Sequence, residues 1–253
     1  NLMINPIAFQ TSFFSIRWYG IMMLIGLFLG FLVWKYLCKE YLNKKEVIEL
    51  YIIIMVGLFI GARLFHVIFY NWSYFSTDPI KILFIWNGGV SSHGAIVGSF
   101  TSYYIGSKIK KIDTWKILDQ AIIGIALAVG FVRIGNFLNS ELVGKITDLP
   151  WCVKFNNKDC RHPVQLYDAI KNFTIFIILY SINQSKKINL PKGTIFWLFI
   201  FTYSSSRFVT EYFKEYIIFN SGLTIGQYLS IPFIIISFSA LILILIKSLP
   251  TRQ

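Results

Sequence analysis

Residues 130–144 read GFVRIGNFLNSELVG, and they place Arg133, Asn136, Asn139 and Glu141 in succession where an apolar run ends. A guanidinium group is planar and stays charged, so it can hold a phosphate or carboxylate through two parallel hydrogen bonds. Arg133 and Asn136 are three residues apart and would share one face of a helix. We expect that helix to stop near Asn139, so that Glu141 folds back toward the same face. The stretch therefore predicts a binding site for an anion.

The composition is that of a membrane protein. Of 253 residues, 55% are hydrophobic and 14% are charged, and the mean hydropathy is +0.61. Several runs approach the ~20 apolar residues that a helix needs to cross a bilayer. The net charge of +12 comes from short basic clusters between apolar segments, which is typical of membrane loops that face anionic lipid. We therefore exclude nucleic acid as a partner.

The apolar runs predict an all-α, polytopic membrane protein, with residues 1–253 as a single integral membrane domain. Backbone groups cannot stay unpaired in hydrocarbon, and these segments are too long for barrel strands, so each should be a helix. The seven expected transmembrane helices are Ile16–Leu37, Ile48–Tyr70, His93–Ile109, Trp115–Ile134, Val164–Asn183, Gly193–Tyr212 and Ile225–Lys247.

The distribution of basic residues predicts the orientation. Lysines concentrate in the connections after the first, third and fifth spans and at the end of the chain, and such connections usually face the cytoplasm. The N-terminus is then outside and the C-terminus inside. Residues 135–163 form the longest outer connection, which we expect to be a small cap on the outer (periplasmic) face. Cys152 and Cys160 share this connection, and whether they form a disulfide is left open.

In this topology, polar residues from several spans converge at one depth near the outer surface. An ionisable side chain inside a span costs about 2.5–3.5 kcal/mol on insertion scales, so several at one level indicate a polar chamber. The converging residues are Tyr19, Arg63, His66, His93, Arg133, Asn136, Gln165, Tyr167, Asp168, Arg207 and Glu211.

Simpler explanations exist for some of these residues. Arg207 and Glu211 are four apart and could neutralise each other as a pair. Arg63 is equally compatible with a side chain that extends to lipid phosphates and with a site role. A histidine at a span entrance, such as His93, is more often structural, and Lys171 has no evident partner. Two buried arginines share few nearby carboxylates, however, and an anionic ligand would balance their charge.

Several segments of the chain are similar to motifs of one known family and occur in the same order. The run RIGNFLNSELVG resembles the signature of the bacterial prolipoprotein diacylglyceryl transferases. The segments IRWYGIMMLIG, GARLFHVIFYN, WNGGVSSHGAIVG, RHPVQLYDA, SSSRFVTEYF and LTIGQYLSIP are similar to further family motifs, in the same order. Departures include Ser140, where Gly or Ala is usual, Ala95, where a second Gly is usual, and the sequence after Glu211. There the family tends to continue with Arg and Pro-Asp, whereas this chain has Tyr212-Phe213-Lys214-Glu215.

The resemblance implies a multi-pass enzyme of the bacterial inner (cytoplasmic) membrane. Such an enzyme transfers the diacylglyceryl group of phosphatidylglycerol to the thiol of the lipobox cysteine of a prolipoprotein, the first step of lipoprotein maturation, and releases glycerol phosphate. Its partners would be phosphatidylglycerol, the prolipoprotein signal peptide with its lipobox cysteine, and membrane lipids, with no metal or other cofactor. By resemblance, the functional residues are Tyr19, His93, Arg133, Asn136, Asn139, Glu141, Gly144, Arg207 and Glu211.

The residue types suggest how these positions would share the chemistry. Arg133 and Arg207 would stabilise the charge that develops on the leaving phosphate, and His93 would accept the thiol proton. The substrate-binding residues would be Tyr19, Asn136, Asn139, Glu141, Gly144 and Glu211, together with Arg133. A membrane transporter or channel for an organic anion is the alternative, although transporters usually bind substrate near the midplane and within repeats.

Overall fold

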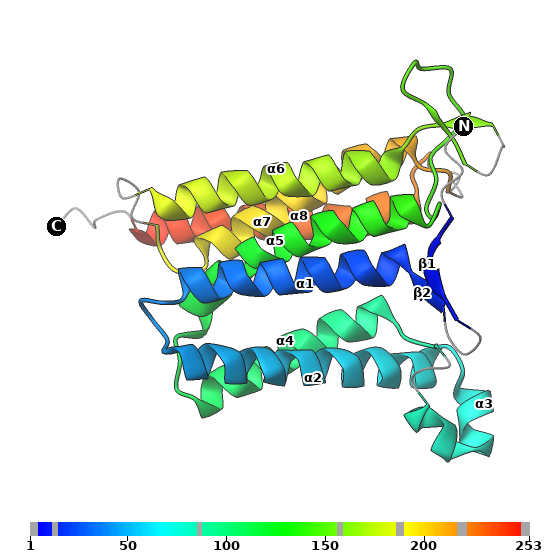
Figure 1. The fold of residues 1–253 in the computed structure, drawn as a ribbon. Coiled ribbons are helices and arrows are strands. Elements are labelled where there is room, and N and C mark those ends of the chain that lie inside the picture. Colours follow the sequence, from blue (N-terminus) through cyan, green and yellow to red (C-terminus); the bar gives the residue numbers. More distant parts are fainter. Residues whose placement is uncertain are drawn as a thin grey trace. The chain divides into compact units, whose positions relative to one another are not determined.

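The computed structural model describes residues 5–11, 15–84, 88–155, 159–185, 190–216 and 222–248 (Figure 1). The chain divides into two compact units, a larger one of Asn1–Tyr36 and Leu118–Gln253 and a smaller one of Leu37–Ile117. In order, the elements are β1 (Ile7–Gln10), β2 (Ser15–Arg17), α1 (Trp18–Leu37), α2 (Lys44–Phe69), α3 (Trp72–Thr77), η1 (Pro79–Leu83), α4 (Ser92–Ile109), α5 (Thr114–Leu138), β3 (Val153–Lys154), β4 (Cys160–Arg161), α6 (Val164–Gln184), α7 (Thr194–Thr210), η3 (Glu211–Phe213) and α8 (Ile225–Ser248).

Every segment that the sequence marks as a span is helical except for end residues; Ile16 and Arg17 at the start of the first span, for example, lie in β2. Four helices, α1, α2, α5 and α8, are long and apolar enough to cross a membrane, counted within the described part of the chain. The other three, α4, α6 and α7, coincide with the remaining expected spans. The prediction of a helical membrane protein is therefore confirmed, while the crossing of all seven helices stays a prediction.

The all-α prediction is incomplete, because the structure adds two short antiparallel strand pairs. β1 pairs with β2 just before α1, and β3 pairs with β4 in the connection between α5 and α6. The strands are two to four residues long, too short to show the alternation by which strands are found in a sequence. Each pair satisfies backbone groups that no helix includes.

Two of the expected boundaries shift by four residues, the largest differences. α2 starts at Lys44 rather than Ile48, because Asn43 and Glu46 form a capping box in which each side chain accepts a hydrogen bond from the other's backbone N–H. α5 continues to Leu138, so Gly135 belongs to its last turn and the outer connection begins later than predicted.

In the larger unit, α6 packs against α7 and α7 against α8. The start of α1, the end of α5 and the start of α6 lie at the same end of this unit (Figure 1). The polar residues of these three termini are thus brought to one level, as the alternating topology predicts within this unit.

In the smaller unit, α2 packs against α4 at very short range. A Cβ atom built on Gly98 would lie 2.9 Å from the Cα of Gly61 and would also collide with the carbonyl oxygen of Gly57. Small residues let helix backbones approach closely where lipid provides no hydrophobic driving force. Glycines on both helices therefore permit the close approach of α2 and α4.

Candidate functional site

The end of α5 carries a continuous series of hydrogen bonds. Arg133 Nη1 donates to Asn136 Oδ1 at 3.2 Å, and Asn136 Nδ2 donates to Glu141 Oε2 at 3.1 Å. The other carboxylate oxygen of Glu141 accepts from Asn139 Nδ2 at 3.1 Å. The backbone N–H of Tyr19 donates to Asn139 Oδ1 at 3.3 Å. Five of the nominated residues are therefore linked in series across α1 and α5.

The backbone after α5 explains how Glu141 reaches this series of hydrogen bonds. Ser140 and Leu142 have φ values of 56° and 54°, the left-handed region that reverses the chain direction after a helix. Glu141 N donates to Asn136 O at 2.9 Å, and Gln165 Nε2 donates to Glu141 O at 2.6 Å. Glu141 thus folds back onto the last turn, as the sequence predicts. Its carboxylate reaches Arg133 only through Asn136.

Asp168, near the start of α6, is the carboxylate that faces Arg133 directly. Its Oδ2 lies 3.9 Å from Arg133 Nε and 3.0 Å from Lys214 Nζ. Its Oδ1 lies 2.7 Å from Lys171 Nζ and accepts from Thr210 Oγ1 at 3.0 Å. One carboxylate from α6 therefore holds cations that come from three parts of the chain.

Glu211 plays the corresponding role on α7 and η3. Its Oε1 lies 3.8 Å from Arg207 Nη2, and its Oε2 lies 3.1 Å from Lys214 Nζ. Because Lys214 contacts both Glu211 and Asp168, it joins the two arginines into one group. We call this group the ion cluster; its members are Arg133, Asp168, Lys171, Arg207, Glu211 and Lys214.

The centre of the ion cluster is buried, and the cluster carries more positive than negative charge. The side chains of Asp168, Glu211 and Lys214 are 4%, 2% and 7% exposed. The arginines are its more accessible members, with 21% exposure for Arg133 and 39% for Arg207. Four cations face two carboxylates in this cluster, and buried charge is costly unless it is paired. The cluster is therefore chemically suited to an anion that approaches the arginines.

Sequence reasoning missed several members of this site. Lys171 was expected to have no partner, and that expectation is wrong: it binds Asp168 and lies over the ring of Tyr203, 5.0 Å from its centre. The spacing of Asp168 and Lys171 at three residues on one helix could have revealed the pair. Tyr203 also interacts with Arg133 and Arg207. No sequence signal links Lys214 to Asp168, because they are distant in the chain.

Gly144 lies where three chain segments meet. A Cβ atom at this position would lie 2.5 Å from the carbonyl oxygen and 2.7 Å from the Cβ of His162. Any side chain would push these segments apart, so packing alone requires glycine here. The predicted role of Gly144 in binding substrate stays a prediction.

Arg63, in the smaller unit, follows neither of the two explanations that the sequence left open. Its guanidinium is buried and donates to the backbone carbonyls of Lys81, Ile82, Phe84, Gly88 and Gly89, at 2.7 to 3.3 Å. These bonds engage the whole guanidinium fork. Arg63 therefore organises the connection between α2 and α4.

His93 is the second residue of α4 and is exposed. Its ring stacks on that of Phe65, with 6.2 Å between the ring centres. It is the one nominated residue in the smaller unit, whereas the other eight lie in the larger unit. Its membership of the same site stays a prediction.

Comparisons with known proteins agree on one family. The family model described as prolipoprotein diacylglyceryl transferase matches residues 6–243. A protein of Pasteurella multocida named phosphatidylglycerol--prolipoprotein diacylglyceryl transferase is 35% identical, over 92% of this chain and 89% of its own length. Proteins with the same name from Campylobacter hominis and Brucella anthropi are 34% and 32% identical; the alignments cover 98% and 94% of this chain and 94% and 91% of theirs.

Proposed function

The chain belongs to the prolipoprotein diacylglyceryl transferase family, and on this premise we propose that it modifies prolipoproteins with lipid from phosphatidylglycerol. The acceptor is the thiol of the lipobox cysteine. Its sulfur attacks the glycerol carbon that bears the phosphate ester, the carbon–oxygen bond breaks, and glycerol phosphate leaves with the electron pair. The product is a thioether, formed in the first step of lipoprotein maturation.

The observation that carries this proposal is the excess of cations in the ion cluster. Phosphatidylglycerol carries a phosphodiester anion, and its departure as glycerol phosphate adds negative charge to the phosphate. Guanidinium groups that are already fixed near this charge stabilise the transition state more than the ground state. Arg133 and Arg207 would supply these groups, since they are the more accessible cations of the cluster.

The neighbouring residues would position the substrates. Asp168 and Glu211 would orient Arg133 and Arg207 through the contacts described above. Tyr19, Asn136 and Asn139 would bind the glycerol head group by neutral hydrogen bonds. His93 would accept the thiol proton, because histidine exchanges protons near neutral pH. This displacement needs no metal or nucleotide.

The same proposal includes a membrane placement. We place the enzyme in the bacterial inner membrane with seven spans, the N-terminus outside, the C-terminus in the cytoplasm, and the connection after α5 as a cap on the outer face. The basic clusters that flank alternate helices support this orientation. The diacyl chains would then stay in lipid while the head group meets the ion cluster.

One assay tests the proposed function. Purified protein, labelled phosphatidylglycerol and a peptide with a lipobox cysteine should yield a thioether lipopeptide and an equal amount of glycerol phosphate. The family assignment does not support the transporter alternative, which predicts transfer of an anion across vesicles without any thioether. Absence of the lipopeptide with folded protein would contradict the proposal.

A further inference from the structure

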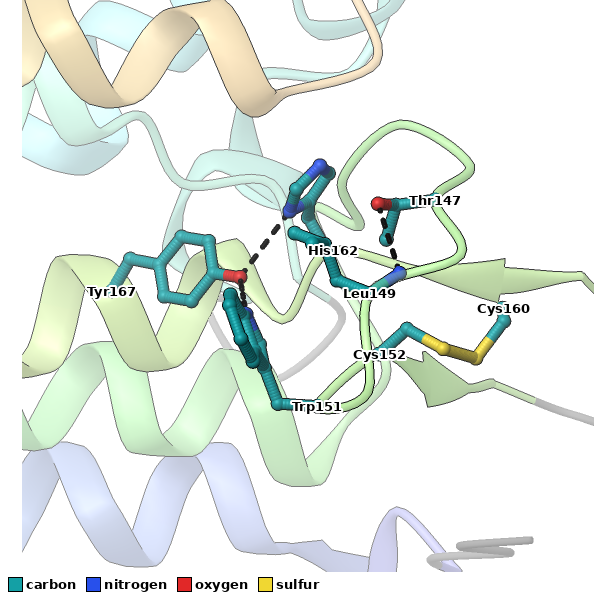
Figure 2. The surroundings of a disulfide bond; sticks show 7 residues. All are labelled: Thr147, Leu149, Trp151, Cys152, Cys160, His162 and Tyr167. Atoms are coloured by element: carbon teal, nitrogen blue, oxygen red, sulfur yellow. Dashed lines mark hydrogen bonds between the residues drawn. A yellow bond between two sulfur atoms is a disulfide. The ribbon is translucent and has the colours of Figure 1, made fainter.

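A disulfide closes the hairpin that precedes α6. Cys152 and Cys160 are bonded (Figure 2). β3 pairs with β4 so that Val153 faces Arg161 and Lys154 faces Cys160. The sequence left this pairing open. Both cysteines are partly exposed, so a small thiol reagent can reach them.

Backbone hydrogen bonds connect this hairpin to the segment 143–147. Thr147 N donates to Cys160 O at 2.9 Å, and His162 N donates to Lys145 O at 3.0 Å. Ile146 and Arg161 form an antiparallel bridge. The guanidinium of Arg161 also donates to Gly144 O at 3.0 Å. The disulfide thus braces a strand that holds the segment 143–147 in place.

The segment 143–147 is connected on its other side to the residues after α7. Lys145 N donates to Phe213 O at 2.8 Å, and Gly144 forms an antiparallel bridge with Lys214. Arg161 Nη1, which also donates to Gly144 O, makes an ion pair with Glu215 at 2.5 Å. The Arg161 side chain thus links all three segments. We call this arrangement the ladder; it consists of 153–154, 160–162, 143–147 and 213–215.

Side chains attach the ladder to the start of α6. Tyr167 Oη accepts from Trp151 Nε1 at 2.8 Å and lies 3.2 Å from His162 Nδ1 (Figure 2). The ring of Phe213 packs edge-on against His162 and Tyr167, with centres 5.2 and 6.0 Å away. Tyr167 directly precedes Asp168 in the sequence. The ladder therefore contacts the start of α6, which carries Asp168 of the ion cluster, and Lys214 belongs to both groups.

From this connectivity we propose that Lys214 is a positioning residue of the transferase and that the Cys152–Cys160 disulfide fixes it. Lys214 belongs to both the ladder and the ion cluster. In the ion cluster, its ammonium joins Asp168 to Glu211. These carboxylates in turn face Arg133 and Arg207. When the disulfide is lost, Lys214 moves and its ammonium no longer holds the carboxylates of Asp168 and Glu211. Arg133 and Arg207 then no longer point at one phosphate.

This inference rests on the proposed function and makes the activity depend on the redox state of the hairpin. Reduction by a dithiol such as dithiothreitol breaks the S–S bond, yields two thiols and converts the reagent to its cyclic disulfide. Alkylation with iodoacetamide then prevents the bond from re-forming. Protein that is alkylated without prior reduction is the matched control, because it carries the same modification at any other thiol.

We expect reduced and alkylated protein to show a kcat/KM for phosphatidylglycerol about tenfold below that of the control, the size expected from one lost charge-assisted hydrogen bond. Most of the change should be in kcat, since the arginines stabilise the charge of the transition state more than that of the bound lipid. The double variant Cys152→Ser/Cys160→Ser should show the same loss of kcat/KM as the reduced and alkylated protein, and its kcat/KM should not change on addition of reductant. Lys154→Ala, an exposed change on the same hairpin, should leave kcat/KM unchanged.

A double-mutant comparison shows whether the disulfide acts through Lys214. Lys214→Met should lower kcat/KM at least as much as loss of the disulfide, and Lys214→Arg should restore most of the activity. If the inference is correct, Lys214→Met combined with the two serines loses no more than Lys214→Met alone. Thermal unfolding of each variant gives the folded fraction to which rates are normalised.

Two results would overturn the inference. One is wild-type kcat/KM in the double serine variant, and the other is full additivity with Lys214→Met. Absence of thioether product from untreated wild-type protein would instead contradict the proposed function, so the two failures are distinguishable.

Discussion

Arg63 and Arg133 are both arginines within long helices, one in each unit, but their surroundings differ in kind. The Arg63 guanidinium is 2.7 to 3.3 Å from five backbone carbonyl oxygens and makes a further contact with the Phe75 ring. Arg133 is held by one amide oxygen at 3.2 Å and one carboxylate at 3.9 Å, and it also interacts with Tyr203.

The difference separates a structural arginine from one that can bind a ligand. A guanidinium has five N–H donors in a rigid fork, and each buried donor needs an acceptor. Arg63 donates its hydrogen bonds to backbone carbonyls of the chain itself. Arg133 and Arg207 retain donor capacity and share carboxylates with two lysines, so an incoming anion improves their pairing.

The largest expected effect is that of Arg133→Lys. Lysine keeps the charge but not the planar fork, so the substitution should lower kcat/KM about 100- to 1000-fold, as for removal of a donor that stabilises transition-state charge. Transfer of labelled diacylglyceryl to a lipobox peptide measures it, with thermal unfolding as the control for folding. Wild-type turnover in this variant would contradict the argument that Arg133 holds the phosphate through two parallel hydrogen bonds.

His93→Gln tests whether the smaller unit contributes chemistry in addition to structure. If His93 accepts the thiol proton, kcat should fall about 100-fold, the typical contribution of a general base. Stopped assays with the peptide at saturating concentration give kcat directly. Near-normal rates would assign the proton to another group, such as Glu141 or a substrate thiol that is already ionised.

Arg63→Lys should affect folding and leave the catalytic rate nearly unchanged. An ammonium cannot reach all five carbonyls, and unpaired buried acceptors should lower the free energy of unfolding by about 3 kcal/mol. The thermal midpoint should fall, while the rate per folded molecule stays within about threefold of wild type. A large drop in kcat at an unchanged midpoint would show that Arg63 is not merely structural.

The smallest effect is expected for Arg17→Ala. This side chain is exposed at the end of β2, and isolated surface changes usually alter stability by less than about 0.5 kcal/mol. Activity should stay within about twofold of wild type. A loss as large as that for Arg133→Lys would place Arg17 in the site. It would also show that burial and pairing do not distinguish functional arginines from the others.

Several features of this chain could be predicted from local sequence. The long apolar runs require helices because hydrocarbon offers the backbone no partners. The spacing of Arg133 and Asn136, and the end of the helix before Ser140, follow from periodicity and from the turn residues that come next. The four-residue spacing of Arg207 and Glu211 likewise predicts their ion pair, at 3.8 Å.

Other features depend on contacts between distant segments. The sequence predicts that Glu141 folds back toward the face of Arg133, yet Asp168 is the carboxylate that faces Arg133 directly. The missed strand pairs each involve four residues or fewer per strand, below the length at which alternation is visible. Lys214 lies beyond the sixth expected span, Gly193–Tyr212, yet its ammonium is buried between carboxylates of two helices.

The sequence by itself determined that the chain is a helical membrane protein, which family it belongs to, and that arginines and amides gather where spans end. It could do so because hydropathy and helical spacing act over a few turns of chain. Only the tertiary structure decided which charges from distant segments pair, because a buried cation needs a carboxylate that is near in space, whatever their separation in the chain. The disulfide-braced ladder and the place of Lys214 are decided in the same way.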